Sequence, residues 1–474
     1  MKLDRVIVPI GAVLLAASLA GIWYPLALPR LLDSSAAAVV LAERAAFFTP
    51  AFAVTAWIGA TLLLAGAMIW KYRRQRLGTG FLFTWQELVL VGVVLVVLVV
   101  TTALDSNRNY LFQPKTSAVD VARQTAMLGI FALGAAVVII SGGIDLSAGS
   151  MIAFSGTTCA TLMLLLAPEE MKYSRPLGLA VITVAIAGTL VVGLLVGTLH
   201  AWLITVVRLP PFIATLATLV GLRSLGRAMC ENATLVQLGG KSTQIQIYDE
   251  QFRYLATSVW IPVVLFLAVA LVIWFVLGFT VVGRHLYALG GNEQAARLSG
   301  IRTHNVKWLA YCIGSLTATL AGILFIADQS VADPQTLGRG YELNGIAAAV
   351  VGGVSLQGGI GTVAGTVLGA LFLRVVIDGV AKVVKTGADV FEGMIVGVVV
   401  VLAVAAGQFW EHIRSGREAL PGTLGIVSIF SLSLLVGVLA MQAAGVVGGC
   451  IVAALAIVLL TALKIFEVVT RSGK

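Results

Sequence analysis

The chain has 474 residues, of which 59% are hydrophobic and only 11% are charged, and its mean hydropathy is +1.01. A soluble domain carries roughly 25% charged residues, so this composition excludes a water-soluble globular protein and predicts a polytopic helical membrane protein. The long unbroken apolar runs exclude a transmembrane β-barrel, whose strands would alternate apolar and polar residues. The 51 glycines suit closely packed membrane helices.

Membrane-spanning helices are predicted wherever about 20 apolar residues follow one another. The run at 341–354 is too short to cross alone, and it predicts a re-entrant or broken helix that is covered by protein or lines a cavity. The fold class is therefore all-α, a polytopic transmembrane bundle of about fourteen spans, which lie near 6–28, 45–70, 87–104, 119–141, 146–166, 177–206, 211–229, 258–281, 306–327, 341–354, 361–381, 389–409, 423–445 and 447–466.

The net charge of +9 indicates membrane topology rather than a nucleic-acid surface, because the basic residues form short clusters between apolar spans. The cluster KYRRQR at 71–76 places that loop and the N-terminus inside the cell. The polar stretch 230–257 then forms an outside loop, and the glycine-punctuated stretch 283–305 forms an inside loop. The N-terminus also resembles a signal peptide with a cleavage site at 18–20, but its apolar run continues to Leu28, which favours an uncleaved span.

A short pattern occurs twice in the chain. The segments GGIDLSAG at 142–149 and GGVSLQGG at 352–359 share the form GG[IV]xLxxG, and each follows an apolar run rich in Ala and Val. Two related halves with glycine breaks in corresponding places indicate the translocation region of a transporter. The alternative is a pair of ordinary glycine turns between helices. The glycines of the two breaks are Gly142, Gly143, Gly149, Gly352, Gly353, Gly358 and Gly359.

Four polar residues beside these breaks are candidates for a translocation path. Asp145 lies between two apolar spans, where a carboxylate is costly unless it is satisfied. One interpretation is that Asp145 lines a polar path. The other is that Asp145 or Ser147 caps the helix predicted to start at 146. The two roles are compatible. Glu342 and Asn344 at the start of the short span carry the same alternatives, with the structural role favoured.

No catalytic, metal or nucleotide site is predicted. Gly240-Lys241-Ser242 resembles the end of a phosphate-binding loop, but Leu235 stands where that motif needs glycine, so an ATPase within this chain is not expected. A membrane-embedded enzyme lacks support because no paired carboxylates gather, and a secondary transporter lacks buried coupling-ion ligands. The side chains without metal-ligand spacing are His200, His285, His304, His412, Cys159, Cys230, Cys312 and Cys450.

Three motifs in order give the chain a family resemblance. They are GGIDLSAGS at 142–150, LGGNEQAARLSGI at 289–301 and the glycine-rich segment 340–371. Together they resemble the permease subunits of bacterial sugar ABC importers, with the closest likeness to the ribose, xylose and galactose group. The resemblance covers roughly residues 85–410.

This resemblance implies a ten-helix permease core, with two related halves, that works as a homodimer in the bacterial inner membrane. It also implies a periplasmic sugar-binding protein and a separate ATP-binding subunit, which binds ATP and Mg²⁺, so this chain itself is not an enzyme and binds no cofactor. The expected solute is a small sugar, a pentose or hexose, moved by alternating access. A nucleoside, an amino acid or another small polar solute is the alternative. Lipid is the remaining partner, and no nucleic acid is expected.

The inner loop that contacts the ATPase in this family corresponds here to 289–301. A short amphipathic helix with Glu293 and Arg297 one turn apart would form there. The positions that match the family pattern are Gly290, Gly291, Asn292, Glu293, Ala296, Arg297 and Gly300.

The chain is longer than the permease core that the resemblance implies. The core corresponds to residues 81–410. Residues 1–80 form an additional N-terminal transmembrane hairpin, and residues 411–474 form an additional C-terminal one.

The topology can be tested with single cysteines. We expect Ser242→Cys to be labelled by a membrane-impermeant thiol reagent in intact cells and Gln294→Cys to remain unlabelled, because the two positions are predicted on opposite sides. The reverse labelling pattern would invert the topology and remove the ATPase-contact assignment of 289–301.

Overall fold

The computed structural model describes residues 85–383, 393, 396–398, 401 and 422–472. The predicted spans 6–28 and 45–70, and most of 389–409, lie outside the described residues. The chain divides into two compact units, residues 1–400 and 401–474, and each is considered by itself.

Helices make up most of the described part of the first unit. Among the described residues, eight helices are long and apolar enough to cross a membrane, and each coincides with a predicted span. The all-α polytopic fold class is thus confirmed, while the count of fourteen spans stays a prediction. The eight helices are α3 (Trp85–Leu104), α5 (Pro114–Ile140), α6 (Ala148–Leu166), α8 (Leu179–Thr205), α9 (Pro211–Leu238), α11 (Trp260–Phe279), α14 (Thr303–Gln329) and α16 (Val363–Val383).

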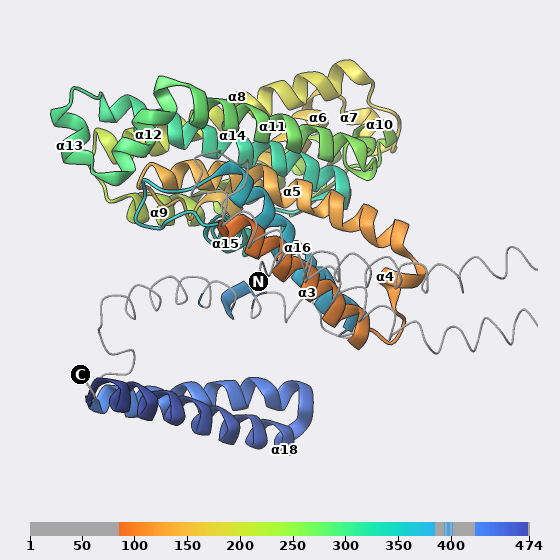
Figure 1. The fold of residues 1–474 in the computed structure, drawn as a ribbon. Helices are drawn as coiled ribbons and strands as arrows, with labels where there is room; N and C mark the ends of the chain where they lie inside the picture. Colours follow the sequence, from red (N-terminus) through yellow and green to blue (C-terminus); the bar gives the residue numbers. More distant parts are fainter. Residues whose placement is uncertain (1–84, 384–392, 394–395, 399–400, 402–421, 473–474) are drawn as a thin grey trace, which may run out of the picture. The chain divides into compact units, whose positions relative to one another are not determined.

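Three of these helices form the centre of the bundle. The membrane-length windows of α5, α6 and α14 are 89%, 83% and 78% buried, whereas α3, α8, α9 and α11 are buried over less than a third of theirs. Helix α14 packs against α8, α5 and α6, and α16 packs between α3 and α5 (Figure 1). The outward faces of the peripheral helices are apolar, as lipid contact requires.

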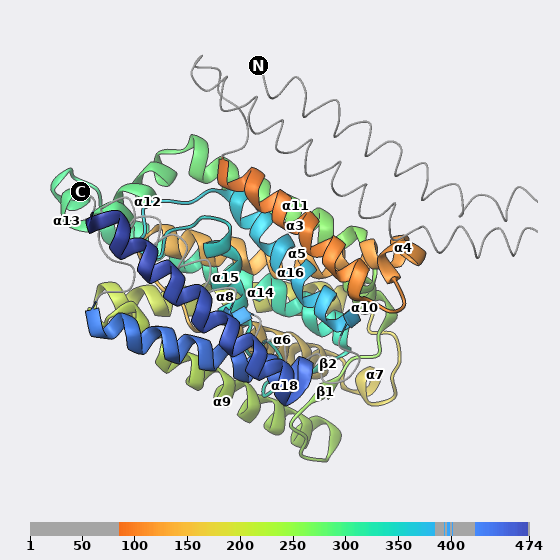
Figure 2. The same cartoon turned by 60° about the horizontal axis from the view of Figure 1, so that its bottom comes forward.

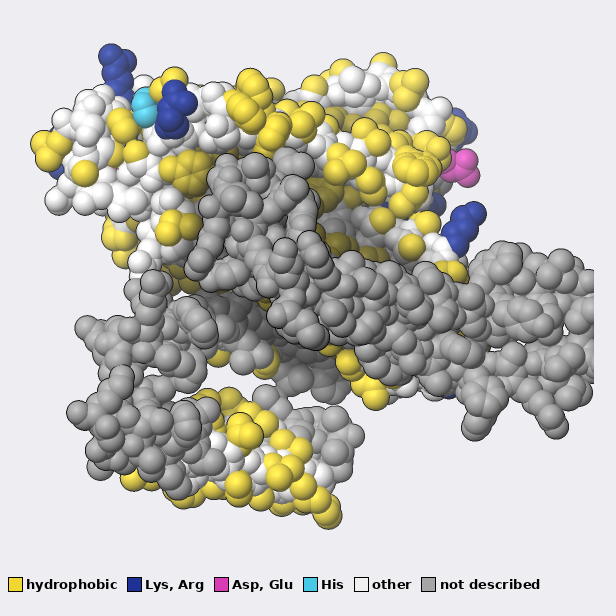
Figure 3. Space-filling model, viewed as in Figure 1, with side chains coloured by type: hydrophobic (Ala, Val, Ile, Leu, Met, Phe, Trp, Pro, Cys, Tyr) yellow, Lys and Arg dark blue, Asp and Glu magenta, His cyan; other side chains and the backbone are white. Residues whose placement is uncertain are grey.

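The short helices that connect the long ones lie at the two ends of this bundle. Helices α12 (Val281–Gly291) and α13 (Glu293–Leu298) lie at one end, and α4 (Asn109–Phe112), α7 (Pro168–Lys172) and α10 (Glu250–Thr257) lie at the other (Figure 1). Apolar side chains cover most of the visible described surface between the ends, and the visible basic and acidic side chains lie toward them (Figure 3). The predicted inside and outside stretches therefore lie at opposite ends.

Neither of the two predicted loops is a simple loop. Helix α9 continues to Leu238, and the stretch 230–257 also contains α10 and strand β1 (Ile245–Gln246). That strand pairs antiparallel with β2 (Val331–Ala332), so it ties two distant segments together (Figure 2). The inside stretch 283–305 folds into α12, α13 and the start of α14. The short helix predicted within 289–301 is α13, and the outside stretch is more ordered than a loop because helical turns extend beyond its apolar run.

The short predicted span is a half-length helix. Helix α15 (Tyr341–Val351) has 11 residues and reaches only about 16 Å. The irregular segment that precedes it is held by Arg223 of α9, whose Nη1 donates to the carbonyl oxygens of Pro334 and Leu337 at 3.2 and 3.1 Å. Such satisfaction of free carbonyl groups is what non-helical backbone requires at membrane depth.

Between residues 422 and 472, the described part of the second unit is α18 (Gly422–Ser472), which turns back on itself. Its two apolar parts are Gly425–Val438 and Val446–Thr461. Gly437 of the first part packs against Ala453 of the second. The position of this unit in a membrane, and its role as an additional hairpin, stay predictions.

Asp249 provides a stability test for the end of the bundle that carries α10. Its carboxylate caps α10 by accepting from the backbone N–H of Phe252 at 2.7 Å, and it also accepts from the N–H of Leu177 at 2.8 Å. We expect Asp249→Ala to lower the free energy of unfolding by about 1–2 kcal/mol, with a smaller loss for Asp249→Asn, which keeps an acceptor oxygen. Thermal unfolding in detergent measures both, and equal losses would contradict the capping role.

Candidate functional site

The first glycine break joins the ends of α5 and α6. Gly142 adopts the left-handed conformation with φ of 82°, which turns the chain after α5. Asp145 then accepts two hydrogen bonds through Oδ1, from the Ser147 backbone N–H at 2.8 Å and from Ser147 Oγ at 2.6 Å. Helix α6 begins at Ala148 rather than at the predicted 146. Asp145 thus organises the turn before the helix, and its side chain is only 6% exposed.

A histidine from α8 closes the polar cluster around this turn. His200 is fully buried, and its Nε2 lies 2.8 Å from Thr218 Oγ1 of α9 and 3.4 Å from Ser147 Oγ. The Ser147 hydroxyl donates to Asp145 Oδ1, and the Thr218 hydroxyl also lies 3.1 Å from the α9 carbonyl oxygen of Thr215. Nε2 donates to Thr218 or accepts from it according to the tautomer of the ring, and Nδ1 has no partner among the described residues.

A tyrosine from α14 covers the same break. The Tyr311 ring lies 6.3 Å from the His200 ring between centroids. Its hydroxyl contacts Gly143, where an added Cβ would lie only 2.6 Å away. We name Asp145, Ser147, His200, Thr218 and Tyr311 the polar cluster.

The second pair of predicted path residues lies beside the start of α6. The Glu342 carboxylate faces Gly149 so closely that a side chain at Gly149 would overlap it. Its Oε2 is buried and accepts no hydrogen bond within the described part of the chain. Asn344 is buried two residues further along α15, about half a turn from Glu342. The structure thus brings Asp145, Ser147 and Glu342 to the region around the start of α6, with the first two in direct hydrogen-bond contact.

The glycines of both breaks meet the end of α12. The backbone N–H of Gly359 donates to the Ile140 carbonyl oxygen at 2.9 Å. A Cβ at Gly290 would overlap that carbonyl oxygen and lie 2.5 Å from the Gly359 nitrogen, and a Cβ at Gly358 would lie 2.9 Å from Gly142 Cα. We name this backbone contact of Ile140, Gly142, Gly290, Gly358 and Gly359 the glycine junction. It requires glycine because the three segments touch through their main chains.

The other repeat glycines have local roles. Gly352 packs against the backbone of Gly365 at the start of α16, and Gly353 has a φ of 92° in the turn after α15. The same turn is held to α12 by Tyr287, whose hydroxyl donates to the Gly361 carbonyl oxygen at 2.8 Å. Burial raises the pKa of Tyr287, so this donor keeps its proton.

Helix α13 projects from the end of the bundle next to the glycine junction. Asn292 caps it by accepting from the Ala295 N–H at 3.0 Å, and Ala296 is its one buried residue. The Glu293 carboxylate forms an ion pair with Lys307 of α14 at 2.7 Å, among the described residues, rather than with Arg297. The predicted pairing within the helix is therefore wrong, because Gly300 turns the chain with a φ of 83° and brings α14 back to it. Leu298 is 90% exposed.

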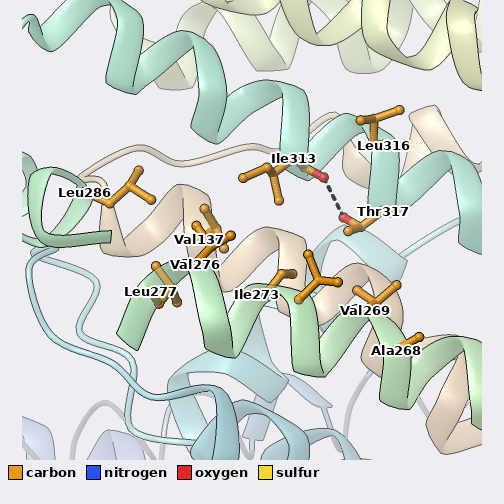
Figure 4. Close-up of a pocket in the computed structure, with 11 residues that line it drawn as sticks. Val137, Ala268, Val269, Ile273, Val276, Leu277, Leu286, Ile313, Leu316 and Thr317 are labelled. Atoms are coloured by element: carbon orange, nitrogen blue, oxygen red, sulfur yellow. Dashed lines mark hydrogen bonds between the residues drawn. The ribbon is translucent and has the colours of Figure 1, made fainter. Parts of the chain in front are cut away.

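An apolar hollow of about 270 Å³ lies apart from the polar cluster. Its lining side chains come from α5, α11, α12 and α14 (Figure 4). The one polar side chain among them is Thr317, and its hydroxyl donates to the Ile313 carbonyl oxygen of its own helix at 3.0 Å. A hollow without a free polar group does not suit a hydrophilic solute.

Sequence reasoning missed His200 and Tyr311. His200 lies close to the end of its span, which made it resemble an interfacial residue, and Tyr311 lies in an apolar run with no motif around it. The signal would have been a polar residue on a neighbouring helix at the same depth in the membrane as Asp145. The depth of a residue relative to another helix is known only once the fold is known. Within the described residues, no three His, Cys, Asp or Glu side chains lie close enough to hold a metal ion.

Membrane-length helices that bury polar side chains at paired chain breaks are the architecture of a membrane transport protein. The family described as the branched-chain amino acid transport system permease component matches residues 117–404, and the chain belongs to this family.

Individual relatives cover the same region. The ribose import permease protein of Escherichia coli (strain K12) is 35% identical over 319 residues, which are 65% of this chain and 90% of that protein. The ribose import permease protein of Bacillus subtilis (strain 168) is 32% identical over 297 residues, 62% of this chain and 86% of that protein. The autoinducer 2 import system permease protein of Yersinia pseudotuberculosis is 32% identical over 321 residues, which are 66% of this chain and 79% of that protein. No solved structure shows a significant match.

The glycine junction can be tested with two adjacent alanines. We expect Gly290→Ala to lower the free energy of unfolding by about 1–3 kcal/mol, as overpacking does, because its Cβ overlaps the Ile140 carbonyl oxygen. Gly291→Ala is the matched control, since no atom lies within 4 Å of its Cβ position. Equal thermal unfolding midpoints for the two variants would show that the junction is not tightly packed.

Proposed function

We propose that this chain is the permease subunit of an ATP-driven importer that moves a small sugar, a pentose or hexose, across the bacterial inner membrane by alternating access. The observation that carries the proposal is the likeness to two ribose import permease proteins over most of their length. The polar cluster supports it, because a hydrophilic solute needs hydrogen-bonding groups at membrane depth.

The path for the solute passes the start of α6. Asp145 and Ser147 border it on the side of α8 and α9, and Glu342 and Asn344 border it on the side of α15. The buried Oε2 of Glu342 and the polar cluster supply acceptors and donors to this path. The two chain breaks give this region its freedom to open.

Helix α13 is the contact for the ATP-binding subunit. The helix projects from the bundle beside the glycine junction, and it offers an exposed Leu298 together with the charged side chains Glu293 and Arg297 for such a contact. ATP and Mg²⁺ are bound by the partner subunit, since this chain has no phosphate-binding loop.

The glycine junction links this contact to the path. Gly290 ends α12 directly before α13, and it touches Ile140 and Gly359, which belong to the two breaks. A displacement of α13 by the ATPase therefore reaches both breaks through rigid main-chain contacts.

Further partners follow from the family. A periplasmic binding protein delivers the sugar to the outer end, and a second copy of the chain completes a homodimer that is surrounded by lipid. No nucleic acid takes part.

Amino acids are the alternative solute class, because the family description names branched-chain amino acids. An amino acid is zwitterionic and needs a cation and an anion in the path. The polar cluster contains a carboxylate but no Lys or Arg, which favours a neutral polyol.

The test of the proposal is uptake by the whole importer. Vesicles that contain the chain with its ATP-binding subunit and its binding protein should accumulate at least one of D-ribose, D-xylose and D-galactose only when ATP is present. Accumulation driven by a proton or sodium gradient alone, or uptake of leucine instead of a sugar, would contradict it.

Charge reversal at Glu293 tests the ATPase contact. The exposed pair with Lys307 contributes at most about 1 kcal/mol to folding, so Glu293→Lys should insert and fold normally. If α13 contacts the ATPase, an unpaired charge in that interface costs about 2–5 kcal/mol, and solute-stimulated ATP hydrolysis and uptake should both collapse. The charge-swapped double variant with Lys307→Glu restores the internal pair and should remain inactive. Recovery of uptake in the double variant would place the effect within the permease instead.

A further inference from the structure

The polar cluster contains two buried groups that the protein itself leaves unused. Tyr311 OH and His200 Nδ1 have no hydrogen-bond partner among the described residues, although the side chains are 1% and 0% exposed. A buried polar group without a partner destabilises the fold. Both groups flank the break between α5 and α6, one against Gly143 and the other through its ring contact with Ser147.

The chemistry of these two groups is complementary to a hydroxyl group. His200 Nδ1 donates or accepts a hydrogen bond according to which ring nitrogen carries the proton. Tyr311 OH can donate and accept. Asp145 Oδ1 and the Ser147 hydroxyl are engaged with each other. The buried atoms of this cluster without a partner among the described residues are therefore one ring nitrogen and one hydroxyl, carried by two different helices, α8 and α14.

We infer that His200 and Tyr311 bind hydroxyl groups of the solute when the break between α5 and α6 opens, and that they determine which polyol passes. This inference rests on the proposed function. In the present conformation the cluster is closed, with Asp145, Ser147, His200 and Tyr311 all at most 6% exposed. Opening at Gly142 and Gly143 exposes His200 Nδ1 and Tyr311 OH to the path. Neither atom has to give up a hydrogen bond to the described part of the protein when this happens.

Tyr311→Phe separates this role from a structural one. The variant removes only the hydroxyl that has no partner, so folding alone predicts an unchanged or higher thermal midpoint. A solute contact predicts that the number of D-ribose molecules transported per ATP hydrolysed falls about tenfold, the ordinary effect of one lost hydrogen bond. The binding protein sets the apparent affinity of uptake, so this transport ratio is the informative quantity.

Thr161→Val is the matched control. Thr161 also has a buried hydroxyl without a partner among the described residues, but it lies near the other end of α6, about 20 Å along the helix from Ser147. It should leave the transport ratio unchanged. His200→Gln provides a second test, because its amide keeps a hydrogen-bonding group near the Nε2 position and has no counterpart of Nδ1. It should fold and show the same loss.

Sugar analogues make the test specific. The wild-type importer should transport D-ribose with a higher ratio than at least one of its monodeoxy analogues, and Tyr311→Phe should remove that difference. If the wild type moves D-ribose and Tyr311→Phe transports every analogue as the wild type does, the inference is overturned while the proposed function stands. If the wild type moves none of D-ribose, D-xylose and D-galactose, the proposed function fails first and the inference falls with it.

Discussion

The main-chain contact between the Ile140 carbonyl oxygen and the Gly359 N–H is the interaction on which the rest of the bundle depends. It joins the end of α5 to the turn before α16, and Gly290 fits against it with no room for a side chain. Main chains that touch directly cannot slide by exchanging rotamers, so the three segments move together or separate. Both halves of the chain and the projecting α13 therefore share one rigid point.

Membrane depth imposes the second constraint, because polar groups there must find partners inside the protein. The irregular segment before α15 meets it through Arg223, and the turn before α6 meets it through Asp145 and Ser147. The polar cluster leaves His200 Nδ1 and Tyr311 OH without partners in the described part of the protein. In a transport protein such groups remain available to form hydrogen bonds with a hydrophilic solute.

The sequence was sufficient for the apolar helices and insufficient for contacts between them. Runs such as those of α11 and α8 exceed the length of a span, so their existence follows from composition. The half-length helix α15 was also predictable, because its apolar run is too short to cross a membrane. By contrast, the pairing of Glu293 with Lys307 depends on a turn at Gly300. His200 becomes informative only when α8 and α9 are known to meet beside Ser147.

The two ends of the bundle are fastened by different means. At one end, strand pairing between β1 and β2 and the buried carboxylate of Asp249 cross-link segments that are far apart in sequence. At the other end, main chains meet directly at glycines, with no side chain between them that could change its rotamer. A sideways push on that end therefore displaces the segments of the glycine junction as one piece, while the cross-linked end keeps its shape.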